Sequence, residues 1–103
     1  MNAKNELVDF LDPELEIRCA SIRFEPYYSQ DTHVHIVLKD NHSPEDYLSF
    51  LDKLDFEYEE GFGIQLLYGT VWLEGGSWLD RGEYDGSEWW EHRVCPEIPS
   101  ECI

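Results

Sequence analysis

Residues 65–94 decide the fold of this chain, and they read QLLYGTVWLEGGSWLDRGEYDGSEWWEHRV. The dipeptides Gly75-Gly76 and Asp85-Gly86 are typical of tight hairpin turns, and each lies between runs of aliphatic and aromatic residues. The stretch therefore predicts a three-stranded antiparallel meander. Its strands are expected over about residues 65–73, 77–84 and 87–94.

Two-residue turns also predict which residues face each other across the meander. The expected pairs are Leu73 with Trp78, Arg81 with Trp90, Glu83 with Glu88, and Asp80 with Glu91. Arg81 beside Trp90 predicts a cation–π contact. Carboxylates that face each other destabilise a sheet, so the polar face of the meander is expected to serve more than stability.

Two more strands are predicted upstream of the meander. Residues 17–24 alternate between apolar and polar with one break near Ala20-Ser21, which indicates a bulged strand. Residues 33–39 are rich in β-branched side chains, as is typical of a second strand. Gly69, inside the longest apolar run, is expected to mark a bulge or a point of twist.

The main helix is predicted over about residues 44–54. Ser43 supplies an N-cap hydroxyl, Pro44 suits the first helical position, and acids follow in the first turn. Its buried stripe is expected to consist of Tyr47, Leu48, Leu51 and Leu54. A short helix over residues 5–11 is also expected.

The chain is therefore predicted to be a single α+β domain over residues 1–103. An antiparallel sheet of four to six strands would carry the helix over about 44–54 on one face. The length suffices for one hydrophobic core without disulfide bonds.

Charge is the most unusual property of the composition. There are 23 Asp and Glu against 7 Lys and Arg, and the formal net charge is −16. Phosphate contacts need a basic surface, so direct binding to nucleic acid or to an anionic membrane is disfavoured. A basic protein partner is favoured instead, and association with it should be fast and sensitive to salt.

Acids and aromatics alternate over residues 55–59, which places Asp55, Glu57 and Glu59 on one face about 6.5–7 Å apart in an extended chain. Phosphates along a nucleic-acid strand have a similar spacing, so this row could imitate a nucleic-acid backbone. The alternative is an ordinary solvated face. The expected partner-binding residues are Asp55, Glu57, Glu59, Glu60, Glu83, Glu88, Glu91 and Trp90.

Adjacent tryptophans suggest a second kind of contact. Trp89 and Trp90 follow each other on a predicted strand, so one should face the core and the other solvent or a partner. Exposed tryptophan is enriched at binding hot spots, and Trp90 is assigned this role.

Catalytic and metal chemistry find little support. His33 and His35 share a strand face, but no further ligand has diagnostic spacing. His92 and Cys95 are three residues apart near a strand end and point to opposite faces. We expect no enzymatic activity, no metal and no cofactor. The odd cysteine count and the absence of a secretory or membrane-spanning apolar run favour the cytoplasm.

Residues 69–90, GTVWLEGGSWLDRGEYDGSEWW, followed by CPEIP at 95–99, resemble a segment of small uncharacterised proteins of bacteriophages and mobile elements. The resemblance covers about a third of the chain and implies the cytoplasm of a bacterial host. In composition alone, the chain is similar to anti-CRISPR and anti-restriction inhibitors that mimic nucleic acid.

Two functional hypotheses follow. In the first, a phage-encoded inhibitor uses its acidic surface to block the basic nucleic-acid-binding site of a host defence complex. In the second, an acidic accessory or structural phage protein binds a protein partner through its sheet edge and an exposed tryptophan. Homodimerisation is compatible with both.

Overall fold

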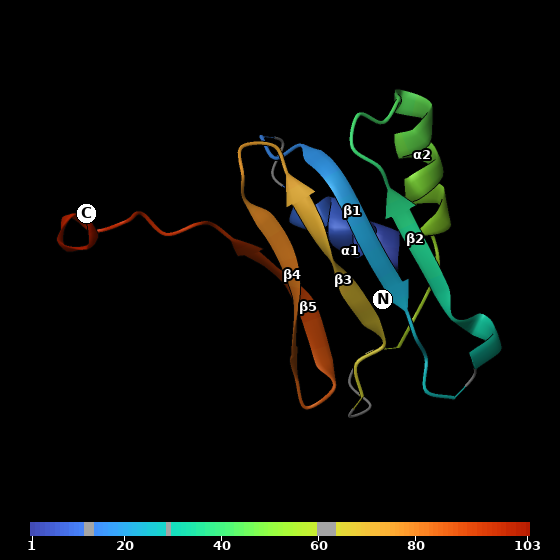
Figure 1. The fold of residues 1–103 in the computed structure, drawn as a ribbon. Coiled ribbons are helices and arrows are strands. Elements are labelled where there is room, and N and C mark those ends of the chain that lie inside the picture. Colours follow the sequence, from blue (N-terminus) through green and yellow to red (C-terminus); the bar gives the residue numbers. More distant parts are fainter. Residues whose placement is uncertain (12–13, 29, 60–63) are drawn as a thin grey trace.

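The computed structural model describes residues 1–11, 14–28, 30–59 and 64–103, and it shows an α+β fold (Figure 1). One antiparallel sheet has five strands in the order β2-β1-β3-β4-β5. The strands are β1 (Ile17–Phe24), β2 (Val34–Leu38), β3 (Leu67–Leu73), β4 (Trp78–Tyr84) and β5 (Ser87–Arg93). The helices are α1 (Ala3–Phe10) and α2 (Pro44–Lys53), with short 3-10 turns η1 (Gln30–Thr32) and η2 (Ser100–Cys102).

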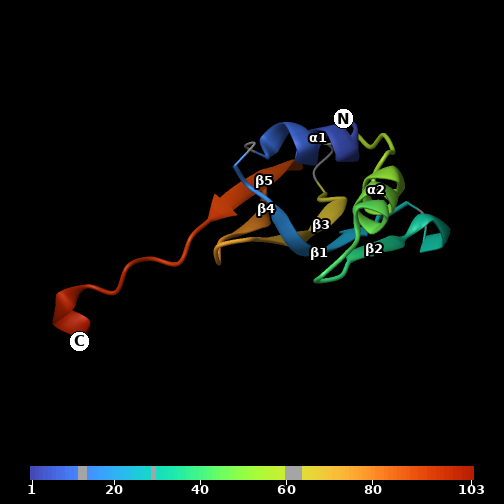
Figure 2. The same ribbon diagram turned by 90° about the horizontal axis from the view of Figure 1, so that it is seen from above.

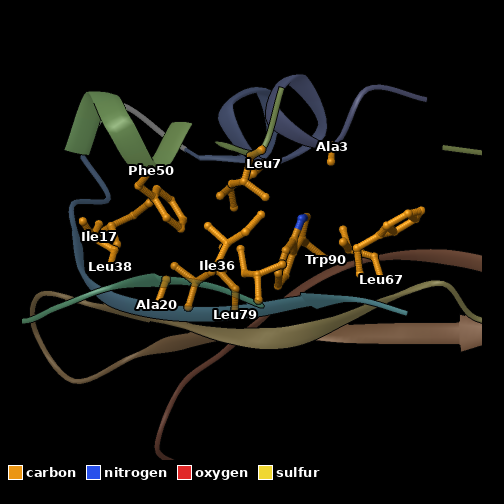
Figure 3. Close-up of a cluster of buried hydrophobic side chains, with 14 of the residues drawn as sticks. Ala3, Leu7, Ile17, Ala20, Ile36, Leu38, Phe50, Leu67, Leu79 and Trp90 are labelled. Carbon is orange, nitrogen blue, oxygen red and sulfur yellow. The ribbon is translucent and has the colours of Figure 1, made fainter. Parts of the chain in front are cut away.

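Both α-helices lie on the same side of the sheet, and the opposite side is open (Figure 2). The core fills the space between the sheet and the helices (Figure 3). Leu7 of α1 and Phe50 of α2 are buried against the inward side chains of the strands. Burying a side chain of this size contributes roughly 1.5–3 kcal/mol, so this layer provides most of the stabilisation. The inward strand residues include Ala20, Ile22, Ile36, Leu38, Leu67, Val71, Leu73, Leu79 and Trp90.

Helix α2 begins as its sequence predicts. The Ser43 hydroxyl accepts the backbone N–H of Asp46 at 3.1 Å, and the Asp46 carboxylate accepts the backbone N–H of Ser43 at 3.1 Å. This reciprocal capping box satisfies two backbone donors that a helix start leaves free.

The buried stripe of α2 differs by one residue from the expected one. Phe50 and Leu54 are buried and Tyr47 and Leu51 are half-buried, whereas Leu48 is 65% exposed. Positions 47, 50, 51 and 54 follow the helical repeat toward the sheet. Leu48 lies about 100° around the helix from Tyr47, so its assignment to the core was wrong.

The register of the sheet confirms one hairpin and corrects the other. In the β4–β5 hairpin, Arg81 faces Trp90 and Glu83 faces Glu88, as predicted. In the β3–β4 hairpin, Trp72 rather than Leu73 faces Trp78. The backbone N–H of Leu73 donates to the carbonyl of Ser77 at 2.9 Å, so the turn holds three residues instead of two. The shift places Trp78 on the open side of the sheet.

The irregularity of β1 lies at Arg18, between Ile17 and Cys19, and not near Ala20-Ser21 as expected. No register shift occurs at Gly69, which pairs with Ile22. Gly69 has φ of 141°, and a Cβ there would come 2.3 Å from the Ser21 carbonyl oxygen. Glycine is therefore required for the close approach of β1 and β3. Among the described residues, no helix is long and apolar enough to span a membrane.

Candidate functional site

The alternating acids form an exposed row beside α1. Asp55, Glu57 and Glu59 are exposed, while Phe56 is half-buried and Tyr58 is buried. The acids are thus exposed, as an acidic face requires, and the aromatic residues between them turn toward the interior. We call the three carboxylates the acidic row. Glu60, the fourth acid expected here, lies outside the described residues.

The start of the chain holds the acidic row in place. The Ala3 N–H donates to the Phe56 carbonyl at 3.0 Å, and the Tyr58 N–H donates to the Met1 carbonyl at 2.9 Å. The Asn2 amide donates to Asp55 at 2.9 Å and to Glu57 at 3.3 Å. One amide thus bridges two neighbouring carboxylates, which fixes the direction in which they point.

A cavity of about 630 Å³ adjoins the acidic row, and we call it the tyrosine pocket. Its walls include Tyr27, Tyr28 and Tyr58 together with Glu57 and Glu59. The first two rings are more than half exposed and meet edge to face, with centroids 5.5 Å apart. Aromatic faces and carboxylates are the groups that bind ammonium and guanidinium side chains. Sequence reasoning missed this pocket because it joins separate parts of the chain.

Glu88 does not belong to a surface patch, which corrects its assignment as a partner-binding residue. It is buried and forms an ion pair with Arg81 at 2.6 Å. It also accepts the backbone N–H groups of Leu66 at 2.8 Å and Leu67 at 3.0 Å. Glu88 faces Glu83 in the sheet, but its charge is paired inside the protein.

Arg81 is the centre of a buried polar cluster, which we call the Arg81 cluster. Besides Glu88, its guanidinium contacts Glu6 of α1 at 3.0 Å and the Tyr58 hydroxyl at 3.1 Å. Burial opposes its charge, but Tyr58, Glu6 and Glu88 more than compensate and raise the pKa of Arg81. Burial, reinforced by a hydrogen bond to Glu6, raises the pKa of the Tyr58 phenol well above its usual range. The cluster joins the start of α1 to the last hairpin.

Trp90 is also buried, so its assignment as the exposed tryptophan was wrong. Its side chain is 3% exposed, and the Arg81 guanidinium lies 4.8 Å from its ring centroid. The predicted cation–π pair is confirmed. Trp89 is the neighbour that points outward, because the helices cover the face that carries Trp90.

Glu83 and Glu91, the other two meander acids expected to bind a partner, lie on opposite faces of the sheet. Glu83 is exposed on the helix side and accepts the Gly86 N–H at 2.8 Å. Glu91 lies on the open side, where it accepts the Trp89 indole N–H at 2.8 Å and binds Arg93 at 2.7 Å. The structure therefore does not bring Glu83, Glu88 and Glu91 together.

The open side of the sheet carries Tyr68, Trp72, Trp78 and Trp89, and we call it the tryptophan face. Trp72 is 43% and Trp89 38% exposed. These residues occupy outward positions of β3, β4 and β5. Their alternation with inward residues was visible in the sequence, but which of the two faces the helices cover was not.

The histidines at the other edge of the sheet have local partners. The His33 Nε2 lies 3.0 Å from the Pro26 carbonyl oxygen, and the His35 Nε2 lies 2.7 Å from the Ser21 hydroxyl. Within the part of the chain that the structure describes, no group of three or more potential ligands could hold a metal ion.

Comparison of the chain with protein-family models, curated proteins and solved structures gave no match. Its function has to be inferred from its own residues.

Proposed function

We propose that this protein is a non-enzymatic binding protein whose acidic row and tyrosine pocket engage lysine and arginine side chains of a partner. The observation that carries the proposal is the adjacency of the three exposed carboxylates and the tyrosine-walled cavity of about 630 Å³. The net charge of −16 would speed the encounter with a basic surface.

The row is suited to a partner that normally holds a nucleic-acid backbone. Its carboxylates belong to alternate residues, and alternate residues of an extended chain lie about 6.5–7 Å apart. Carboxylate–guanidinium contacts are short and charge-assisted, as phosphate–guanidinium contacts are. Because the Asn2 amide already orients Asp55 and Glu57, less side-chain entropy is lost on binding.

The tyrosine pocket would add an anchor to this electrostatic row. An arginine that enters it meets the exposed rings of Tyr27 and Tyr28, with Glu57 and Glu59 at the same wall. A cation over an aromatic ring gains about 0.5–2 kcal/mol, depending on how completely it is desolvated. Row and pocket together would therefore favour a site rich in arginine.

We further propose that the partner is the nucleic-acid-binding site of a host defence complex and that inhibition results from competition. This step is supported by the resemblance of residues 69–90 to bacteriophage proteins and by the acidic composition.

A pull-down from bacterial host lysate at low and high salt tests the proposal. The wild-type chain should capture a nucleic-acid-binding complex that high salt or added nucleic acid releases. The double variant Glu57→Lys and Glu59→Lys should lose that capture. Replacing Glu97 and Glu101 with lysine is the matched control, because both are exposed in the C-terminal tail and the net charge changes equally. Equal loss in both variants, or no loss in either, would overturn the assignment to the acidic row.

A further inference from the structure

The tryptophan face is a candidate interface that the acidic row does not use. Both α-helices lie on the other side of the sheet, and the C-terminal tail leads away from it (Figures 1 and 2). The indole of Trp89 lies over Gly82, where a Cβ would come 2.5 Å from its Nε1. The ring thus lies along the sheet and presents an apolar surface outward.

The indole N–H groups of this face and the charged groups beside them are paired within the chain. The Trp78 indole N–H donates to Asp80 at 3.0 Å, and the Trp89 indole N–H donates to Glu91 at 2.8 Å. Arg93 approaches both carboxylates, Glu91 at 2.7 Å and Asp80 at 3.7 Å. Covering the face would leave these hydrogen bonds in place, so no donor or acceptor among them would lose its partner.

The charge of the tryptophan face differs from that of the whole chain. On this side of the sheet, Arg18, Arg23 and Arg93 lie beside their ion-pair partners Asp40, Glu25, Asp80 and Glu91, so the charges nearly cancel. The chain as a whole carries −16. A basic partner would be drawn to the acidic row more than to this nearly balanced face. A second copy meets here a surface that offers both signs of charge for mutual pairing.

The size of the face suits a modest interface. The five strands lie about 4.8 Å apart and have about seven residues each, so the sheet measures roughly 24 Å by 23 Å. Its flat area is therefore about 550 Å², without the additional surface of the side chains. Two such faces would bury about 1,100 Å² in total, which is less than the roughly 1,600 Å² of a standard interface but more than the roughly 1,000 Å² that a specific one needs. The face is therefore large enough for a weak, reversible, concentration-dependent dimer.

We infer that the tryptophan face binds a second copy of this chain, forming a symmetric dimer in which two open sheets stack face to face. Stacked sheets lie about 10 Å apart and interlock through their side chains. Tyr68, Trp72 and Trp89 supply the apolar contact. A two-fold axis lets Arg93 of each copy approach acids of the other.

Sedimentation equilibrium of the purified chain over a wide concentration range tests this inference. A monomer–dimer equilibrium is expected, and added salt should strengthen the dimer because it screens repulsion between two chains of −16. Binding of a basic partner to the acidic row has the opposite salt dependence, so the two interfaces are distinguished. A chain that stays monomeric at every concentration and salt level would overturn the inference.

The variant Trp72→Lys should raise the dimer dissociation constant roughly thirtyfold, as expected for loss of a hot-spot tryptophan. Leu48→Lys is the matched control: Leu48 is an exposed apolar residue of α2 on the opposite side, and its replacement adds the same charge. The control should dimerise like the wild type. Dimerisation unaffected by Trp72→Lys, or abolished equally by Leu48→Lys, would overturn the assignment to this face.

Folding of the variants is checked by circular dichroism. If Trp72→Lys does not fold, tryptophan emission of the wild type remains decisive. It should shift to the blue on dimerisation as exposed indoles lose water, and an unchanged spectrum across the transition would contradict burial of the tryptophan face.

Discussion

Replacing Glu88 with alanine should lower the free energy of unfolding by about 3–5 kcal/mol. The side chain of Glu88 is fully buried, and that of its partner Arg81 is 2% exposed. The Arg81 guanidinium and the Glu88 carboxylate lie 2.6 Å apart. Truncation would leave a buried guanidinium with Glu6 as its remaining carboxylate and would free the N–H groups of Leu66 and Leu67.

The magnitude follows from these contacts. A buried backbone donor that loses its acceptor costs about 1–3 kcal/mol, and breaking a buried ion pair by removing one partner costs about 3–5 kcal/mol. The terms overlap, because water that enters the gap would satisfy some donors. Domains of this size have about 5–15 kcal/mol of stability in total, so the variant would be severely weakened.

Urea unfolding followed by tryptophan fluorescence measures the change, with equal m-values as the check that both native states are equally compact. Glu83→Ala is the matched control, because Glu83 faces Glu88 across the same hairpin but is exposed. Its loss should be about 0.5–1.5 kcal/mol, from the hydrogen bond to Gly86. If Glu88→Ala cost no more than Glu83→Ala, the buried-pair argument would be refuted and Glu88 would be an ordinary surface acid.

Three further predictions concern stability. Ser43→Ala should cost about 1 kcal/mol in urea unfolding by removing the helix cap, whereas Ser43→Asp should cost little. Gly69→Ala should lower the free energy of unfolding by more than about 1 kcal/mol, because the new Cβ would collide with the Ser21 carbonyl oxygen. Gly75→Ala should lower it by less, because no atom lies within 4 Å of a Cβ at that position. The raised pKa of Tyr58 keeps its phenol protonated in the folded state at pH values where the unfolded chain ionises, above about 10. The folded state then holds more protons, so stability should fall as pH rises past about 10, and this fall should be smaller in Tyr58→Phe.

The acidic row could be predicted from sequence because its geometry is local. An extended segment turns successive side chains to opposite faces, so acids at 55, 57 and 59 share a face wherever the segment lies. The tyrosine pocket beside it could not be predicted. Tyr27 and Tyr28 come from the connection after β1, and only the packed fold brings them to Glu57.

The Arg81 cluster shows the same division. The cation–π contact between Arg81 and Trp90 follows from the two-residue turn at Asp85-Gly86, which sets the pairing of β4 with β5. The contact between Arg81 and Glu6 joins residues 75 positions apart. No local pattern marks Glu6 or Glu88 as buried among so many similar acids.

The sequence by itself determined the features that depend on neighbouring residues: the capping box of α2, the register of the last hairpin and the row of acids. Tertiary structure alone decided which face of the sheet the helices cover. Alternation shows that Trp89 and Trp90 lie on opposite faces, but burial of one of them depends on where α1 and α2 pack. For the same reason Glu88 became an internal ion-pair partner, and Trp72, Trp78 and Trp89 came to share an open surface.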